Sequence, residues 1–183
     1  RTYEAGIRVN SQSGKSRSAW LIEQNHGLKL PRALQQDFSQ HVQQETDRHG
    51  KEMTQNALWQ LFRTRYGLVE TPQFALQSYR SDSQQDGQLR LTASVATQGG
   101  TRQLEGHGNG LLSAAAHGLS RWINAPFVIK DYHEHTLGER SDSRSVAYIR
   151  CLFQDGTSRW GVGIDSDVAR ASLQALFNAV SRS

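Results

Sequence analysis

In the N-terminal part of the chain, apolar positions recur with the period of a helix. Leu34, Phe38 and Val42 fall at i, i+4 and i+8, which places them on one face. Pro31 stands where a first helical residue would be, and its fixed φ suits that position. Gly50 is typical of the residue that ends a helix. The pattern therefore predicts a helix between Pro31 and Gly50.

A second helix is predicted directly after it. Thr54 is a suitable N-cap residue, and Gly67 ends the apolar pattern. The predicted apolar face consists of Leu58, Leu61 and Phe62.

The segments that flank these helices are irregular. Residues 1–29 are polar, and Ala19 to Ile22 is the one short extended candidate within them. Thr71-Pro72 interrupts the chain and marks a boundary. We therefore predict a helical linker subdomain over residues 1–70 and a second domain over residues 71–183.

After Pro72 the apolar residues alternate, as they do in strands. Asp86-Gly87 separates the runs 74–81 and 89–95, and this dipeptide between two such runs is a strong hairpin signal. Gly99-Gly100 makes the next turn, and a third strand extends to about Glu105. A helix follows, whose predicted apolar face is Leu112, Ala115, Ala116, Leu119, Trp122 and Ile123.

The same order of elements then recurs. One strand is predicted to begin with Phe127, Ile129 and Asp131. Two more are predicted from Val146 to Phe153 and from Trp160 to Ile164, with Asp155-Gly156 as a turn. The last helix has Asp165 as its predicted N-cap and an apolar face formed by Val168, Ser172, Ala175, Leu176 and Ala179.

Residues 71–183 thus read as two βββα repeats in an α+β domain. The connections between the third strand and the helix support the repeat, because glycine-rich segments precede both helices: Gly106 to Asn109 precedes the first and Gly161 to Asp165 the second. One helix can cover only one face of each sheet, so apolar surface should remain uncovered. We therefore expect the domain to form a homodimer.

Composition narrows the partners. The chain has 183 residues and a net charge of +4, but its basic residues are scattered rather than gathered in a stripe, which argues against nucleic acid. No apolar stretch is long enough for a membrane helix, and no signal peptide is evident. With Cys151 as the single cysteine, a reducing cytoplasmic location is expected.

Gly108-Asn109-Gly110 is the first candidate binding motif, because it precedes a predicted helix. N–H groups at a helix start bind carboxylates and phosphates, and glycine lets a ligand approach the backbone. Asn109 can cap the helix or donate to a ligand. An ordinary turn and cap would explain the same residues.

Asp131-Tyr132-His133-Glu134-His135 is dense in ligand-type side chains. On a strand His133 and His135 point the same way, so a pair of imidazoles with a carboxylate could hold zinc. Further ligands at conventional spacing are not evident, and polar positions on a half-exposed strand are the alternative interpretation. Cys151 lies in an alternating strand, where a small buried residue is expected rather than a nucleophile. No metal site and no catalytic residue are predicted.

Several strings, in order, resemble the region that follows the catalytic part of 2-isopropylmalate synthases. These strings cover essentially the whole chain and are 1–5, 7–15, 26–32, 35–39, 108–110, 131–135 and 160–164.

The resemblance implies a regulatory role. That family condenses acetyl-CoA with 2-oxoisovalerate in leucine biosynthesis, using a metal-dependent catalytic barrel that is absent here. The segment present would carry no catalytic residue and no cofactor of its own. It would dimerise through two βββα units and bind leucine, or a related small amino or oxo acid, as feedback inhibitor.

Carried over position by position, the effector site would comprise Gly108, Asn109, Gly110, Ser113, Ile129, Tyr132, Thr136 and Ser143. Ser113, Thr136 and Ser143 stand where leucine-sensitive relatives carry alanine, and Leu111 stands where they usually carry proline. Added hydroxyls and bulk should polarise and shrink the pocket, which would weaken leucine binding or favour another small acid.

Two other functions fit the same residues. The first is a stand-alone small-molecule-binding or scaffold protein that kept the fold without the barrel. The second is an enzyme in its own right, with His133, Glu134 and His135 around a metal.

Overall fold

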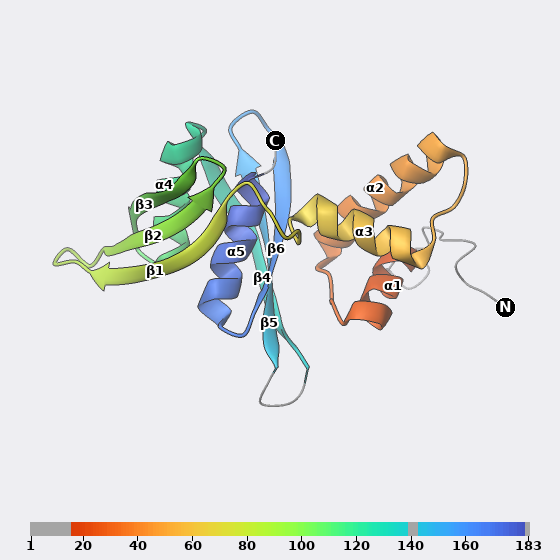
Figure 1. The fold of residues 1–183 in the computed structure, drawn as a ribbon, viewed down its shortest axis with the longest axis horizontal. Helices are drawn as coiled ribbons and strands as arrows, with labels where there is room; N and C mark the ends of the chain where they lie inside the picture. The colour runs from red at the N-terminus through yellow and green to blue at the C-terminus, as the bar shows by residue number, and fades with distance from the viewer. Residues whose placement is uncertain (1–15, 139–142, 182–183) are drawn as a thin grey trace. The chain divides into compact units, whose positions relative to one another are not determined.

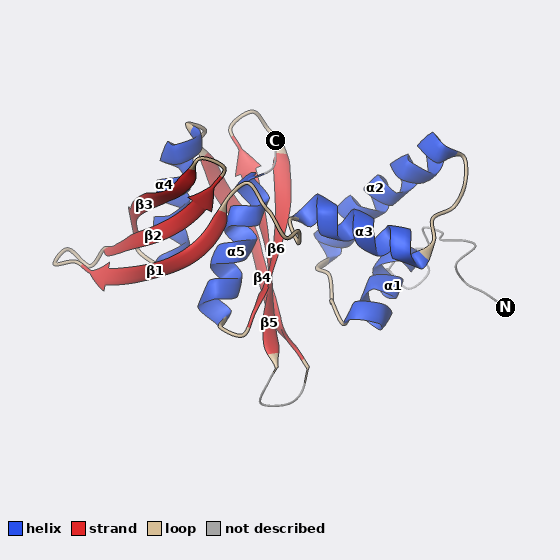
Figure 2. Ribbon diagram, viewed as in Figure 1, coloured by secondary structure: helices blue, strands red, loops and turns tan. Residues whose placement is uncertain are grey.

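The computed structural model describes residues 16–138 and 143–181, and the chain divides into two compact units, Arg1–Arg65 and Tyr66–Ser183 (Figure 1). The strings over 1–5 and 7–15 that contribute to the family resemblance lie outside the described residues. Each unit is described by itself below. Figure 2 shows that the described part of the first unit is helical and that every strand among the described residues belongs to the second.

Unit 1 begins with a helix that the sequence pattern did not predict. Helix α1 spans Arg17–His26, so the extended segment expected at Ala19 to Ile22 is wrong. The Ser16 hydroxyl caps the helix by accepting the N–H of Ala19 at 3.1 Å, and Gly27 ends it with a φ of 74°. A short apolar run can be helix or strand, and these two caps decide for a helix.

The other two helices of unit 1 agree with the prediction. Helix α2 spans Arg32–His49 and α3 spans Gln55–Tyr66, with Pro31 in the N-cap position of α2 rather than within it. Gly50 ends α2 with a φ of 70°, and the Thr54 hydroxyl accepts the N–H of Ala57 at 3.1 Å. Phe38 and Phe62 pack edge to face between the two helices, with ring centroids 5.2 Å apart.

Unit 2 contains the two predicted βββα repeats. Each repeat is a three-stranded antiparallel sheet followed by a helix. The first repeat consists of β1 Ala75–Ser83, β2 Leu89–Thr97, β3 Gly100–Gly108 and α4 Leu111–Ile123. The second consists of β4 Phe127–Leu137, β5 Arg144–Phe153, β6 Ser158–Asp165 and α5 Val168–Ser181. The fold class α+β is confirmed.

The two repeats share one hydrophobic core. Leu91, Ala93 and Leu104 from the first sheet join Ala147, Ile149 and Cys151 from the second in a single buried cluster with α4 and α5. Figure 1 shows α5 between β1 of one sheet and the strands of the other, and α5 contacts β1, β5 and β6. Neither repeat could bury its apolar face alone, which explains why they occur as a pair.

Glycines let each helix lie directly on its own sheet. A Cβ at Gly106 would stand 1.9 Å from the carbonyl oxygen of Ala114, and one at Gly163 would stand 2.2 Å from that of Ala171. Both distances are far inside van der Waals contact, so only glycine fits. Gly106 is therefore structurally equivalent to Gly163. The sequence comparison paired it with Gly161, which is two residues too early.

A β-bulge interrupts the first strand of each repeat at the same place. The register shifts between Leu76 and Ser78 in β1, and between Ile129 and Asp131 in β4. A tyrosine follows directly in both strands, at Tyr79 and Tyr132. Bulges aim side chains away from the regular alternation, and these two re-aim equivalent tyrosines.

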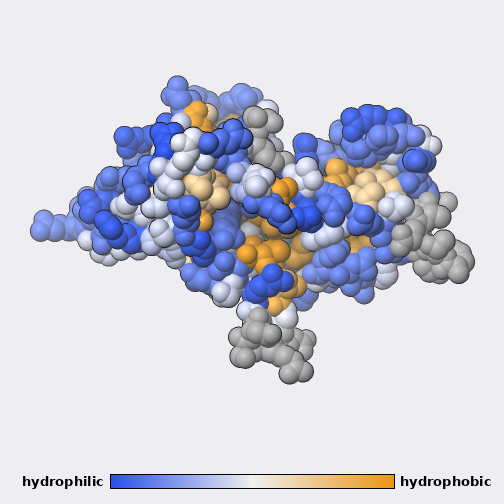
Figure 3. All heavy atoms as spheres, viewed as in Figure 1, coloured by the Kyte–Doolittle hydropathy of each residue, from blue (hydrophilic) through white to orange (hydrophobic). Residues whose placement is uncertain are grey.

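Exposure differs between the strands of unit 2. Figure 3 shows that the tip of the β1–β2 hairpin is hydrophilic. Strand β5, by contrast, is buried on both faces from Val146 to Ile149. Among the described helices, none combines the length and apolar character that crossing a bilayer requires.

Candidate effector site

The start of α4 is held by a small network around Ser113. Gly110 is the N-cap, and its carbonyl accepts the N–H of Ala114 at 3.0 Å. The Ser113 hydroxyl accepts the N–H of Gly110 at 3.1 Å and lies 3.0 Å from Oδ1 of Asn109, to which it can donate. The hydroxyl that was expected to polarise the pocket is therefore satisfied within its own turn.

The first turn of α4 can accept an anion. The first N–H groups of any helix lack intrahelical partners and carry the positive end of its dipole. No acidic residue occurs in the first turn of α4, and a Cβ at Gly110 would meet no atom within 4 Å. The N-cap thus has open space beside it and no acidic side chain in the turn that follows, and ligand binding at Gly108-Asn109-Gly110 stays a prediction.

Gly108 also has a packing role. A Cβ there would stand 2.4 Å from Oγ of Ser113 and 2.6 Å from the amide nitrogen of Ala114. Glycine therefore lets the first turn of α4 lie against the end of β3. This position is required by the fold whether or not a ligand binds.

The other predicted residues lie on β4 and its hairpin. Ile129 pairs with Cys151 and packs against the core, whereas Tyr132, which pairs with Ile149, is 38% exposed. Thr136 is exposed further along β4. Ser143 lies across the hairpin from Gly138, and a Cβ at Gly138 would stand 3.7 Å from the Cβ of Ser143.

Tyr132 connects β4 to α5. Its hydroxyl lies 2.8 Å from Oγ of Ser172 and donates to Oε1 of Glu134 at 3.1 Å. Burial raises the pKa of the phenol, and the Glu134 carboxylate adds to the rise. The structure thus joins Asn109, Gly110 and Ser113 to one another, whereas the hydrogen bonds of Tyr132 run to its own strand and to α5.

The histidine-rich motif is used within the second sheet. Asp131 forms an ion pair with Arg150, and Nε2 of His135 lies 2.7 Å from the buried Tyr148 hydroxyl. In the first repeat, the backbone N–H of His107 donates to Nδ1 of His117 at 3.0 Å. Within 16–138 and 143–181, no three His, Cys, Asp or Glu residues are grouped to hold a metal.

Burial raises the pKa of the Cys151 thiol to about 12, so this sulfur is a protonated core atom.

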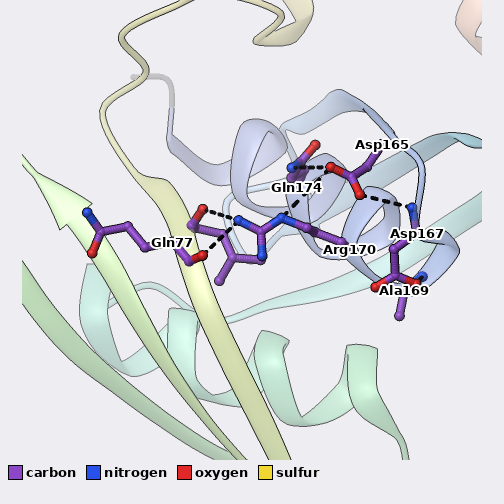
Figure 4. A network of polar contacts seen from close by, with 7 residues as sticks. Gln77, Asp165, Asp167, Ala169, Arg170 and Gln174 are labelled. Carbon is purple, nitrogen blue, oxygen red and sulfur yellow. Dashed lines mark hydrogen bonds and ion pairs between the residues drawn. The ribbon is translucent and has the colours of Figure 1, made fainter. Parts of the chain in front are cut away.

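The start of α5 carries a charged network that sequence reasoning missed. Arg170 donates from Nη2 to the carbonyls of Leu76 and Gln77, at 2.9 Å each, and its Nε lies 3.8 Å from Oδ1 of Asp165 (Figure 4). The N-cap is Asp167 rather than the predicted Asp165, since the Asp167 carbonyl accepts the N–H of Ala171 at 2.9 Å.

Asp165 instead accepts the N–H of Asp167 through Oδ2 at 2.9 Å. The sequence shows Asp165 and Asp167 followed by Arg170, but it does not show that the Arg170 side chain binds backbone carbonyls of β1.

A cavity of about 600 Å³ lies elsewhere in unit 2. It is bordered by the start of β1, the α4–β4 connection, the β5–β6 turn and the end of α5. Its lining residues are Gln73, Phe74, Ile123, Asn124, Ala125, Pro126, Phe153, Gln154, Asp155, Arg159 and Val180. None of the eight predicted effector residues lines it.

Comparison with known proteins gives a consistent result. The sequence profile of the LeuA allosteric (dimerisation) domain matches residues 52–183. The chain is 48% identical over 180 residues to the 2-isopropylmalate synthase of Marinomonas sp. (strain MWYL1), an alignment that covers 97% of the chain and 32% of that enzyme.

It is 40% identical over 182 residues to the 2-isopropylmalate synthase of Rhodospirillum rubrum, covering 99% of the chain and 33% of that enzyme. The corresponding enzyme of Thermobifida fusca is 40% identical over 185 residues, with 100% of the chain and 31% of the enzyme covered. The chain spans about a third of the length of these relatives.

Proposed function

The chain belongs to the LeuA allosteric (dimerisation) domain family, and we propose that it is the effector-binding and dimerising part of a 2-isopropylmalate synthase. In this proposal it forms a homodimer and binds leucine, or a related small amino or oxo acid, as an allosteric inhibitor. The catalytic barrel of the same enzyme would be its partner and would condense acetyl-CoA with 2-oxoisovalerate.

The observation that carries the effector proposal is the open N-terminus of α4. A carboxylate at this position can accept N–H groups that the helix itself leaves unpaired. The N-cap Gly110 leaves space for it, and no acidic side chain in the first turn competes. Ile129 on β4, a strand that α4 contacts, is partly buried against the core and would supply the apolar wall that a branched side chain needs.

Titration calorimetry of L-leucine into the 183-residue chain tests effector binding. We expect saturable binding with one site per chain, and weaker binding of glycine, which carries the same charged groups without the apolar side chain. Absence of heat with both ligands, on a chain whose circular dichroism shows a folded α+β protein, would contradict the effector proposal.

Light scattering tests the assembly. We expect a mass twice the 20.5 kDa of one chain. A single-chain mass at micromolar concentration would contradict the homodimer without bearing on the effector site.

A further inference from the structure

The cavity of about 600 Å³ in unit 2 lies where the two repeats meet. Phe74 and Ile123, from the beginning and the end of the first repeat, line one part of it. Phe153 and Val180, from β5 and α5 of the second repeat, line another. Ligand pockets commonly have volumes of about 300–1,000 Å³ and mostly apolar walls with a few polar groups. The cavity is therefore large enough for a small molecule that contacts both repeats.

Backbone hydrogen bonds fix the walls of this cavity. The N–H of Ala125 donates to the carbonyl of Ser120 at 3.1 Å, which holds the α4–β4 connection against the end of α4. The N–H of Gln154 donates to the carbonyl of Pro126 at 3.3 Å, which joins the same connection to the end of β5. A ligand would therefore enter a space that exists before it binds and would order little of the chain.

Arg159 places a positive charge in the wall. Its Nη1 donates to the carbonyl of Val180 near the end of α5 at 3.4 Å, and its Cζ lies 4.5 Å from the centre of the Phe153 ring. A guanidinium has five N–H donors in one plane, so it can bind a carboxylate through two of them while it keeps other contacts. Among the described residues that line the cavity, Arg159 is the only cation.

The carboxylate of Asp155, which also lines the cavity, is bound within its own turn. Its Oδ1 accepts the hydroxyl of Thr157 at 2.7 Å and the N–H of the same residue at 2.9 Å. An anionic ligand would therefore meet the guanidinium of Arg159 on one side and a carboxylate that already has partners on the other. One cation beside one anion favours a ligand with a single negative charge over a doubly charged phosphate ester.

We propose that this cavity is a second ligand site of the domain, for a small carboxylic acid with an apolar body. The carboxylate would accept N–H groups of the Arg159 guanidinium. The apolar body would lie against Phe74 and Ile123, on the side of the first repeat. None of the eight residues of the proposed effector site lines the cavity, so the two sites are separate.

Occupancy of this site would stabilise the pairing of the two repeats. A ligand that binds the folded domain and not the unfolded chain adds to the free energy of unfolding. Here the added contacts would join the end of α4 to the β5–β6 turn and the end of α5. The site would thus act on the shared core from a place that the effector does not touch.

Two probes of the same shape test the role of the charge. 3-Phenylpropanoate and 3-phenylpropanamide share the aromatic body and differ in the carboxylate. Titrated into the full chain and followed by ¹H–¹⁵N NMR, the acid should shift the amide signals of residues 123–125 and 154–155 saturably, and should leave those of residues 108–113 in place. We expect the amide to bind at least about tenfold more weakly, because it cannot form the charged pair with Arg159.

Other outcomes would overturn the proposal. They are equal affinities for the two probes, shifts confined to residues 108–113, or no shifts at the solubility limit of the acid. Binding of L-leucine at the start of α4 is measured independently, so the effector proposal stands or fails without reference to these results.

Two arginine variants locate the charge. Arg159→Gln should weaken binding of 3-phenylpropanoate at least about tenfold. Arg121→Gln is the matched control, because Arg121 is exposed in the last turn of α4 and does not line the cavity. It changes the net charge equally and should alter binding less than about twofold, since an exposed charge is screened by salt. Equal affinities of the two variants would contradict the proposal.

A third variant tests the cavity without touching the cation. Ala125→Leu adds bulk to a residue that lines the cavity, and it leaves the contacts of Arg159 with Val180 and Phe153 in place. It should lower the affinity for 3-phenylpropanoate at least about tenfold by filling the space of the apolar body. Urea unfolding shows that each variant is folded. If Arg159→Gln fails to fold, unchanged binding by Ala125→Leu is still sufficient to show the proposal wrong.

Discussion

Helices α4 and α5 end equivalent repeats, yet they occupy different environments. Helix α5 is buried at nearly every position from Ala171 to Ser181, whereas only Ala114, Ala115, Gly118 and Leu119 are buried in α4. The start of α5 is closed by its own carboxylates and Arg170, and the start of α4 is left open. Both repeats contribute to the shared core, but α5 is buried along most of its length, whereas α4 keeps an exposed side and has no acidic residue in its first turn.

If the proposed effector site is at the start of α4, the duplicated unit combines stability in one repeat with binding in the other. A helix that both sheets need cannot also exchange a ligand at its start without loosening the core. The peripheral helix can do so because its outer side already faces solvent. The following substitutions test this division, beginning with the largest expected effect.

Gly163→Ala should destabilise the domain most, by about 3 kcal/mol, because the new Cβ would collide with the backbone of the central helix. Its ideal position is 2.2 Å from the carbonyl oxygen of Ala171. Gly106→Ala should cost less, about 2 kcal/mol, since α4 can shift outward. Urea unfolding measures both. A larger loss at Gly106 would reverse the assignment of central and peripheral helices.

Arg170→Ala should cost about 2 kcal/mol, because the Leu76 and Gln77 carbonyls lose a charged donor and Asp165 loses a cation. Ser113→Ala, at the equivalent position, should cost less than about 1 kcal/mol, since its bonds stay within one turn. Arg170→Lys is the control that keeps the charge but not the two-carbonyl geometry. Equal losses for Arg170→Ala and Ser113→Ala would show that the bridge between repeats contributes nothing.

Tyr132→Phe should lower stability by about 1 kcal/mol, the usual value for one hydrogen bond. The change removes the part-buried bond to Ser172 at 2.8 Å and the exposed bond to Glu134, and Ser172→Ala removes the first of these from the other side. The double variant should then lose less stability than the sum of the two single losses, because each single variant already removes the shared bond. Strictly additive losses would indicate that this bond does not stabilise the pairing of β4 with α5.

Alkaline pH should give the smallest effect. The pKa of Tyr79 is raised in the folded domain above its ordinary value of 10.0, first by burial and then by Asp167. Stability linked to this group is therefore complete below about pH 10 and falls as the pH rises through the folded-state value, because the unfolded chain ionises first. Unfolding measured from pH 9 to 11 should show a shallower decline in Tyr79→Phe than in the unsubstituted chain.

The repeat architecture could be predicted because local signals fix it. Gly87 and Gly156 adopt φ values of 81° and 91° at the Asp-Gly turns, and each turn sets the register of its hairpin. Helix α1 was missed because four apolar residues favour helix and strand about equally. Its caps, Ser16 and Gly27, lie outside that run and decide the outcome.

The candidate site was predictable only in part. The motif at Gly108 to Gly110 lies at a helix start, as its glycines indicated. The hydrogen bonds from Arg170 to β1 were not predictable. Their acceptors are backbone carbonyls of a strand in the other repeat, and every residue has a carbonyl whatever its type. The hydrogen bonds of the Ser113 hydroxyl were missed for a related reason. Its partners, the N–H of Gly110 and Oδ1 of Asn109, are brought to it by the geometry of the helix start.

The central position of α5 has a consequence for synthesis. A ribosome delivers all six strands of unit 2 before it delivers α5, which follows them in chain order. Until that helix emerges, the apolar faces of β1, β5 and β6 have no helix to cover them, and a nascent chain in this state exposes surface that favours misassembly. The domain should therefore be most prone to misassembly in the interval after β6 has emerged from the ribosome and before α5 has done so.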